Sequence, residues 1–114
     1  MISFACKRVG FDELLMCSFG LTKGEYRLLM LLLERGEESN IKELSRLAGV
    51  DRSTSQKSIS NLMKKELVMR RQVNQPNGGY FFYYSPIRKE LIKQRMVQTL
   101  KNWNMAVERA ITEW

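Results

Sequence analysis

The stretch IKELSRLAGVDRSTSQKSISNLMKKELV, residues 41–68, decides the fold of this chain of 114 residues. In residues 41–48 the apolar side chains recur at helical spacing, and Asn40 precedes them as a candidate N-cap, which predicts a short helix. Asp51 is a candidate N-cap for a second helix, which we expect over about 52–67. The few residues between the two helices must therefore form a tight corner.

The corner consists of Leu47-Ala48-Gly49-Val50-Asp51. Ala48 is small enough to let the helices approach each other, and Gly49 can adopt the positive φ that most residues resist. Val50 is expected to fill the angle between the helices. This order of helix, glycine turn and helix is the helix-turn-helix pattern, in which the second helix stands out from the domain and can enter the major groove of DNA.

The second helix is expected to present polar and basic side chains outward. Ser55 should face inward together with Ile59, Leu62 and Met63. The outward side chains have donors and acceptors that can read base edges or hold phosphates. The candidates for DNA contact on this helix are Arg52, Ser53, Thr54, Gln56, Lys57, Ser60, Asn61 and Lys64.

Two further helices are predicted upstream of this stretch. Residues 10–19 carry apolar side chains at helical spacing. Thr22 and Glu25 form the pattern of a capping box, which opens a helix that Gly36 ends. Because residues 26–33 are apolar nearly all round, this helix is expected at the centre of the domain.

Residues 68–84 predict a β-hairpin downstream. VMRRQV (68–73) is strand-like, QPNGG (75–79) is a tight turn, and YFFYY (80–84) is rich in strand-forming aromatic residues. Arg70 and Arg71 lie on the first strand and are further candidates for DNA contact, either with the flanking backbone or in the minor groove.

The aromatic residues of the second strand alternate between two faces of the hairpin. We expect Phe81 and Tyr83 to pack on the domain. Tyr80, Phe82 and Tyr84 share the other face, which is expected to lie against the C-terminal helix or a partner chain.

Residues 87–114 contain neither proline nor glycine and predict one long helix. Its apolar side chains are spaced alternately four and three residues apart, which is typical of a coiled-coil seam. Packing of this helix on its own domain is the alternative, but two tryptophans in the seam favour a second chain. We therefore expect a homodimer, assisted by residues 1–19. The seam consists of Met96, Leu100, Trp103, Val107, Ala110 and Trp114.

The positive charge is concentrated in the middle of the chain. The net charge is +7, and residues 41–72 hold eight basic and three acidic side chains, for a net +5. A basic surface of this size favours polyanions, of which nucleic acid is the commonest.

Composition argues against an enzyme, a metal site and a cofactor. The chain has no histidine and two cysteines, which leaves too few ligands for a zinc site and removes the commonest general base. No glycine-rich phosphate loop is present. The longest apolar run, residues 28–33, is too short to span a membrane, and no signal peptide is evident, so a cytoplasmic location is expected.

Cysteine and methionine each allow two interpretations. Cys6 and Cys17 are interpreted as small packing residues, with a redox switch as the alternative. The seven methionines are interpreted as core filling, with a hydrophobic pocket for a small-molecule effector as the alternative.

Residues 20–84 resemble the winged helix-turn-helix domain of the MarR-like and TrmB-like transcription regulators. The matching stretches are GLTKGEYRLLMLLLERG (20–36), residues 41–68 and GGYFFYYSP (78–86), and the likeness is greatest to short, mainly archaeal TrmB-like proteins with a helical tail. The resemblance implies a dimer that binds duplex DNA and controls transcription. It also implies that Arg52, Ser53, Thr54, Gln56 and Lys57 face the groove and that Arg70 and Arg71 belong to the wing.

The chain departs from this family in two respects. Ser55 stands where the pattern usually has an apolar residue, so the second helix is expected to be less firmly seated. The sugar-binding domain of longer TrmB-like proteins is absent, so sugar sensing is not implied.

The predicted fold is mainly α with a small β-hairpin. It comprises a helical extension (1–19), a winged helix-turn-helix DNA-binding domain (20–86) and a dimerisation helix (87–114). A homodimer would place its two helices 51–67 in successive major grooves, roughly 34 Å apart, on a pseudo-palindromic site. The alternative function is a winged-helix protein–protein adaptor in a transcription or replication assembly.

Overall fold

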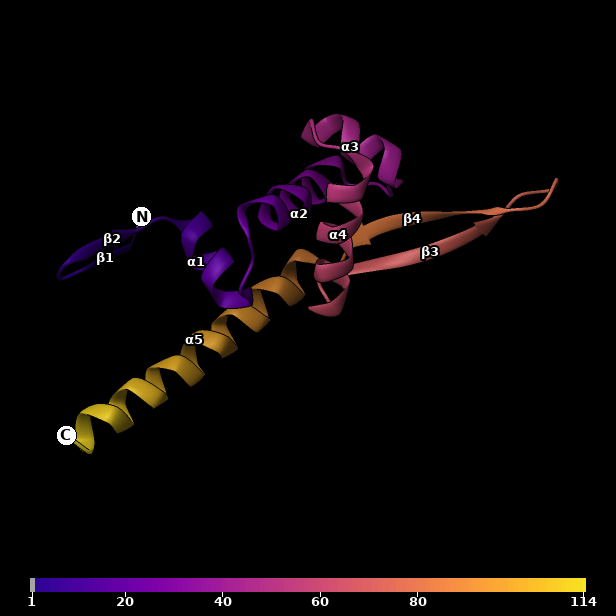
Figure 1. Cartoon of the computed structure of the whole chain (residues 1–114). Coiled ribbons are helices and arrows are strands. Elements are labelled where there is room, and N and C mark those ends of the chain that lie inside the picture. Colours follow the sequence, from indigo (N-terminus) through magenta and orange to yellow (C-terminus); the bar gives the residue numbers. More distant parts are fainter. Residues whose placement is uncertain (1) are drawn as a thin grey trace. The chain divides into compact units, whose positions relative to one another are not determined.

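The computed structural model describes residues 2–114, which form five helices and two antiparallel β-hairpins (Figure 1). In chain order the elements are β1 (Ile2–Phe4), β2 (Lys7–Val9), α1 (Phe11–Phe19), α2 (Lys23–Arg35), α3 (Ile41–Ala48), α4 (Arg52–Lys64), β3 (Val68–Asn74), β4 (Tyr80–Pro86) and α5 (Lys89–Thr112). They form two compact units: one comprises Thr22–Lys89, and the other joins the segment before Thr22 to Glu90–Trp114. The predicted fold class is confirmed.

Three helices begin at the side-chain caps that the sequence predicts. The Thr22 hydroxyl accepts from the Glu25 backbone N–H, and the Glu25 carboxylate accepts from the Thr22 N–H, both at 3.2 Å, which completes the capping box. Asn40 and Asp51 accept from the first turns of α3 and α4 at 2.8 and 2.7 Å. Each cap stabilises its helix by about 1 kcal/mol, so local sequence fixes where these helices start.

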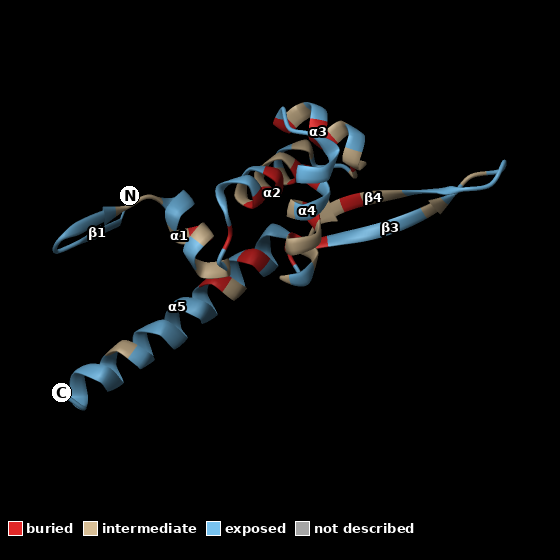
Figure 2. Cartoon of the chain, viewed as in Figure 1, coloured by how far each residue is buried: buried red, intermediate tan, exposed pale blue. Residues whose placement is uncertain are grey.

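The core of the unit Thr22–Lys89 lies around α2, which packs against α3, α4 and β4 (Figure 2). Its buried side chains are Leu28, Leu29, Leu32, Leu44, Ile59, Leu62, Leu67, Val68 and Tyr84. Burial of one such aliphatic side chain contributes roughly 1.5–3 kcal/mol. The central position predicted for the helix that follows Thr22 is therefore confirmed.

The corner between α3 and α4 turns at Gly49, whose φ of 70° lies in the left-handed region. Ala48 is buried, as a close approach of the helices requires. Val50 is 38 % exposed, so the expectation that it fills the angle between the helices is wrong. Its backbone N–H bonds back to the Ser45 carbonyl at 3.1 Å, which completes the end of α3 and leaves the Val50 side chain exposed.

Ser45 of α3 and Ser55 of α4 meet inside this corner. Both are buried, and their Oγ atoms form a hydrogen bond of 2.9 Å. Ser55 thus faces inward as predicted, but its contact is a second hydroxyl. Because a buried hydroxyl without a hydrogen bond costs free energy, each serine depends on the other.

Helix α4 ends at Lys64, earlier than the predicted end near Leu67. Glu66 adopts a φ of 58°, and the Leu67 N–H bonds to the Leu62 carbonyl at 3.0 Å. This left-handed turn directs Leu67 and Val68 into the core, where β3 begins. The prediction was too long because Leu67 continues the apolar spacing of the helix.

The hairpin β3–β4 is called the wing below. It pairs Val68 with Pro86 at its base and Asn74 with Tyr80 at its outer end. Ser39, in the loop between α2 and α3, exchanges two backbone hydrogen bonds with Tyr84, at 2.8 and 3.0 Å. The base of the wing is therefore fixed to the helices, while its outer part projects away from them (Figure 1).

Tyr84 is the aromatic residue of β4 that enters the core. It is 1 % exposed, whereas Phe81 is 49 % exposed and Tyr83 is half-buried, so the expectation that Phe81 and Tyr83 pack on the domain is wrong. The backbone pairing with Ser39 holds Tyr84 at the base of the wing, next to the helices. Phe81 lies further out along the hairpin.

The second unit contains α1, α5 and the hairpin β1–β2. Helix α1 ends at Gly20 in the left-handed region, and the Arg95 guanidinium of α5 lies 5.0 Å from the centre of the Phe19 ring. The hairpin pairs Ile2 with Val9 and was not predicted, because strands of three residues are too short to display an alternating pattern. Within residues 2–114 no helix combines the length and the apolar character that crossing a membrane requires.

Cys6 and Cys17 are both free and exposed. The interpretation of these cysteines as packing residues is therefore wrong, since neither side chain contributes to a core.

Candidate nucleic-acid interface

The first half of α4 presents its polar side chains to solvent. The exposed residues there are Arg52, Ser53, Thr54, Gln56 and Lys57. Hydrogen bonds from Thr54, first from its side chain and then from its backbone, hold the pKa of Asp51 below its usual value. Asp51 therefore stays ionised at neutral pH and keeps the start of the helix ordered.

The second half of α4 is turned partly inward. Lys64 is exposed, but Ser60 and Asn61 are half-buried. The Asn61 amide nitrogen donates to Glu25 Oε2 of α2 at 2.9 Å, so the expectation that this side chain points outward is wrong. Its hydrogen-bonding capacity is used inside the domain.

Glu25 joins α2 to α4, a role that sequence reasoning missed. It is 4 % exposed, and Oε1 accepts from Lys65 Nζ at 3.3 Å. Burial acts to raise the pKa of Glu25, but hydrogen bonds from Asn61, the Thr22 backbone and Lys65, with the charge of Lys65, together lower it. The ionised carboxylate thus holds the end of α4 against the start of α2.

The two arginines of β3 have different surroundings. The Arg70 guanidinium lies 4.1 Å from the centre of the Phe82 ring, which in turn contacts Tyr80 edge to face at 5.1 Å. Arg71 forms a two-point ion pair with Glu38, at 2.7 and 2.9 Å. The hydrogen bonds and charge of Arg71 lower the pKa of the Glu38 carboxyl, and those of Glu38 raise the pKa of Arg71.

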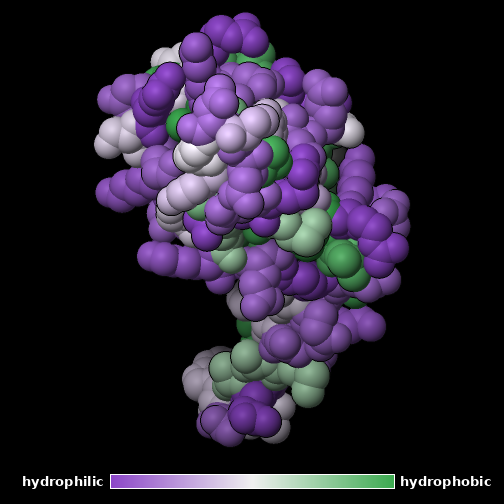
Figure 3. Space-filling view, turned by 90° about the vertical axis from the view of Figure 1, so that its right-hand side faces the viewer, coloured by the Kyte–Doolittle hydropathy of each residue, from purple (hydrophilic) through white to green (hydrophobic). Residues whose placement is uncertain are grey.

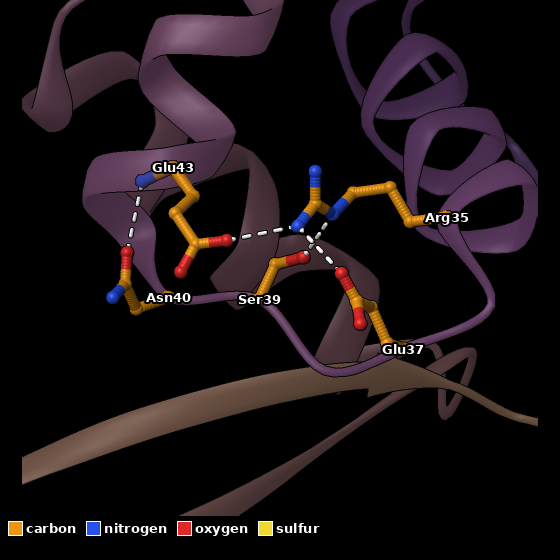
Figure 4. Close-up of polar contacts among 5 residues, drawn as sticks. All are labelled: Arg35, Glu37, Ser39, Asn40 and Glu43. Carbon is orange, nitrogen blue, oxygen red and sulfur yellow. Dashed lines mark hydrogen bonds and ion pairs between the residues drawn. The ribbon is translucent and has the colours of Figure 1, made fainter.

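A polar network fixes the loop between α2 and α3, whose Ser39 pairs with β4 (Figure 4). Arg35 Nε donates to Ser39 Oγ at 2.8 Å, and Arg35 Nη2 donates to Glu37 and Glu43 at 3.0 Å each. Ser39 also pairs with Tyr84. The network therefore connects the wing to the end of α2 and to the start of α3. Of this loop only Asn40 was predicted from the sequence, as an N-cap.

An open groove separates the first turn of α4 from the wing. It is lined by Asn40, Ile41, Lys42, Arg52, Gln56, Tyr80, Phe81, Phe82 and Tyr84. Both exposed cations at its rim, Lys42 and Arg52, come from helix N-terminal turns. Hydrophilic side chains dominate the side of the molecule from which the wing projects (Figure 3). This groove has the charge expected for a polyanion.

Helix α5 exposes apolar side chains along its second half. Leu100 is 37 % and Trp103 62 % exposed, while Val107 is half-buried and Ala110 is exposed. Trp114 is 105 % exposed and follows the end of α5 at Thr112, so the predicted helix 87–114 was too long. Met96 differs from the rest of the predicted seam: it is 5 % exposed within a single chain. Met96 is thus already covered within one chain.

A helix-turn-helix whose second helix exposes basic and polar side chains beside a β-hairpin defines the class of winged-helix transcription regulators. Within that class, this chain belongs to the TrmB family. The family model described as sugar-specific transcriptional regulator TrmB matches residues 15–90. An uncharacterised protein from Methanocaldococcus jannaschii is 31 % identical over 113 residues, which cover 99 % of this chain and 85 % of that protein.

Two solved structures place the fold. A possible transcriptional regulator from Methanosarcina mazei Go1 superposes with a TM-score of 0.91 at 29 % identity, covering 100 % of this chain and 96 % of the other. MarR from Staphylococcus aureus, solved with salicylate and kanamycin, gives 0.56 at 12 % identity, covering 88 % and 65 %. The second likeness concerns the fold alone. The predicted resemblance to MarR- and TrmB-like winged-helix regulators is confirmed.

Proposed function

We propose that this winged-helix regulator binds duplex DNA sequence-specifically as a homodimer, with α4 in the major groove. The observation that carries the proposal is the exposed first half of α4, which lies across the groove from the wing. The major groove, about 12 Å wide, admits one helix. In this arrangement residues 20–86 act as the DNA-binding domain.

The side chains of α4 divide into base-reading and phosphate-holding groups. Gln56 can bond adenine through two atoms, and Arg52 or Lys57 can bond guanine in the same way. Ser53 and Thr54 suit either bases or phosphates, and Ser60 and Lys64 lie further along the helix, near the flanking backbone. Asn61 is left out of the proposed surface, because its amide is bonded to Glu25.

The groove between α4 and β4 suits the sugar-phosphate strand that separates a major groove from the next minor groove. Lys42 and Arg52 stand at its rim, and Arg70 rests on the aromatic ring of Phe82. These cations would neutralise phosphates on that strand. The wing would then lie on the flanking backbone or in the minor groove. We place the protein in the cytoplasm, where such DNA would be met.

The homodimer is proposed to form through α5, with help from the segment before Thr22. Trp103 is large and exposed on α5, and Trp114, also exposed, follows the end of the helix at Thr112, which favours a second copy of the chain as their cover. Val97 and Ile111, also exposed, widen this apolar surface. Two copies would present two α4 helices to half-sites roughly 34 Å apart.

The test is duplex binding by the full chain, using genomic fragments selected by the wild-type protein. We expect affinity to fall steeply with salt, and R52E/K57E to lose about 100-fold or more while its oligomeric state is unchanged. The matched control is R88E/K89E, which makes the same change of charge at two exposed residues between the wing and the seam of α5. Normal binding by R52E/K57E would refute the assigned face. Weak binding without sequence preference would favour a protein–protein adaptor.

A further inference from the structure

The outer part of the wing has no charged side chain. From Gln72 to Ile87 the sequence contains no Asp, Glu, Lys or Arg, although charged residues make up 27 % of the chain. The two arginines of the wing, Arg70 and Arg71, lie in its inner part, no further out than the middle of β3. The outer wing therefore cannot form ionic contacts with phosphates. Any contact that it makes with DNA must be polar or apolar.

Exposed aromatic rings occupy this neutral region. Tyr80 is 57 % exposed and Phe81 is 49 % exposed. Because they are consecutive in a strand, their side chains point to opposite faces of the wing. Tyr80 pairs with Asn74, so both rings lie beside the turn. An aromatic ring thus stands on each face of the wing, next to its polar turn.

Side-chain amides accompany the rings. Gln72 donates to Asn74 at 3.1 Å on one face of β3, and Gln75 and Asn77 lie in the turn. Amide groups can bond the acceptors that A·T pairs present in the minor groove. Apolar side chains beside such amides are the type that wedges between base steps and bends DNA.

The reach of the wing fits this position. The seven residues of β3 extend about 23 Å at roughly 3.3 Å per residue. The groove lined by Arg52, Gln56 and the rings of β4 is continuous with the outer wing, since Tyr80 and Phe81 belong to its lining. If one sugar-phosphate strand lies in that groove, a hairpin of this length would extend from it toward the adjacent minor groove.

With the wing in the minor groove next to the major groove held by α4, as the proposed function allows, we propose that Tyr80 and Phe81, one on each face of the wing, wedge against A·T-rich base steps and bend the duplex. This inference rests on the proposed DNA-binding function. The wedge reads how easily a step deforms, in addition to the bases that α4 contacts. It adds specificity that is insensitive to salt, because no counterion is released by a neutral side chain.

The experiment uses the full-length protein and a duplex that the wild type selects, labelled at both ends for energy transfer. Wild-type protein is expected to bring the ends closer. Y80S/F81S should lose the bend and about tenfold or more in affinity, with an unchanged slope of affinity against salt. R70Q should instead lower that slope by about one. M69S, which removes an exposed apolar side chain from the base of the same hairpin, serves as the control.

Y80L/F81L tests whether the effect needs an apolar wedge, and it should keep most of the bend. Thermal unfolding of each variant establishes that it is folded. A duplex bound by wild type without bending, or bent equally by Y80S/F81S, overturns the wedge and leaves the proposed function standing. Failure of the wild type to bind any duplex overturns both. Loss of the dimer in Y80S/F81S would overturn the wedge by assigning the rings to a protein contact.

Discussion

Asn61 of α4 and Glu25 of α2 are joined by a hydrogen bond of 2.9 Å from the amide nitrogen to carboxylate Oε2. The second carboxylate oxygen accepts from Lys65 Nζ and from the Thr22 N–H. This buried carboxylate holds the end of α4 against the start of α2, while the first half of α4 stays exposed. The orientation of α4 therefore depends on a residue outside the proposed DNA contact.

Substituting Glu25 with alanine should destabilise the fold by about 2–3 kcal/mol. The change removes one half of the capping box and leaves the Asn61 amide without its acceptor. Urea unfolding at pH 7 measures the loss. Glu34, exposed on the same helix, provides the control, and E34A should stay within about 0.5 kcal/mol of the wild type. Equal stability of E25A and E34A would contradict the role of Glu25 in holding α4 against α2.

The pKa of Glu25 also predicts how stability depends on pH. Its pKa is lower in the folded chain than its ordinary value, so its contribution is complete above the unfolded pKa and is lost as pH falls through the folded pKa. Unfolding free energies measured from pH 7 to pH 3 should therefore decline more steeply for the wild type than for E25Q. Parallel curves would contradict this contribution.

Local sequence was sufficient to predict where the helices begin. Thr22, Asn40 and Asp51 each cap the helix that follows within three residues, so their effect needs no information about the rest of the chain. The left-handed turn at Gly49 was predictable for the same reason. The exposure of the first half of α4 was predictable from the position of its N-cap. Once the start of the helix is fixed, the polar residues fill its outward positions.

Contacts between distant segments could not be read from the sequence. The Asn61–Glu25 bond spans 36 positions, and Arg71 pairs with Glu38 across 33. Tyr84 is buried because Ser39 pairs with its backbone, which the alternation of aromatic residues in β4 does not reveal. Spacing can thus assign a polar side chain to the outward face of a helix although that side chain is hydrogen-bonded to another element.

The Arg71–Glu38 pair predicts that removing the negative charge of Glu38 strengthens DNA binding. E38Q releases Arg71 for phosphate contact, so affinity should rise several-fold and its dependence on salt should steepen by up to about one. Stability should change by no more than about 1 kcal/mol, because the pair is exposed. E37Q removes the same charge from the neighbouring residue, which is paired with Arg35 instead. If both variants gain equally, the gain comes from net charge alone.

The buried Ser45–Ser55 bond predicts a specific pattern of stability. S55A leaves the Ser45 hydroxyl buried without this partner, and should cost about 1–2 kcal/mol. S45A should behave in the same way, whereas S45A/S55A should cost less than the sum of the two. A double-mutant cycle by chemical denaturation measures this coupling. Strict additivity would mean that the two hydroxyls do not support each other.

Substitutions on α5 should affect dimerisation at Trp103 and folding at Met96. Trp103 is 62 % exposed in the single chain, whereas Met96 is 5 % exposed. L100D/W103D should therefore give a folded monomer by sedimentation, because a charge at each position opposes burial in an interface. M96A should instead lower stability by about 2–4 kcal/mol and leave the dimer intact at concentrations where it is folded.

The control for charge is Q98D/N102D, which places two carboxylates on exposed positions outside the seam. It should remain dimeric. The monomer should bind a single half-site with the weak affinity of one α4 and lose the preference for two half-sites spaced by one helical turn, because simultaneous contact with both requires the linked pair. A dimer that survives L100D/W103D but is lost in M96A would mean that the partner packs on the part of α5 that the single chain already covers.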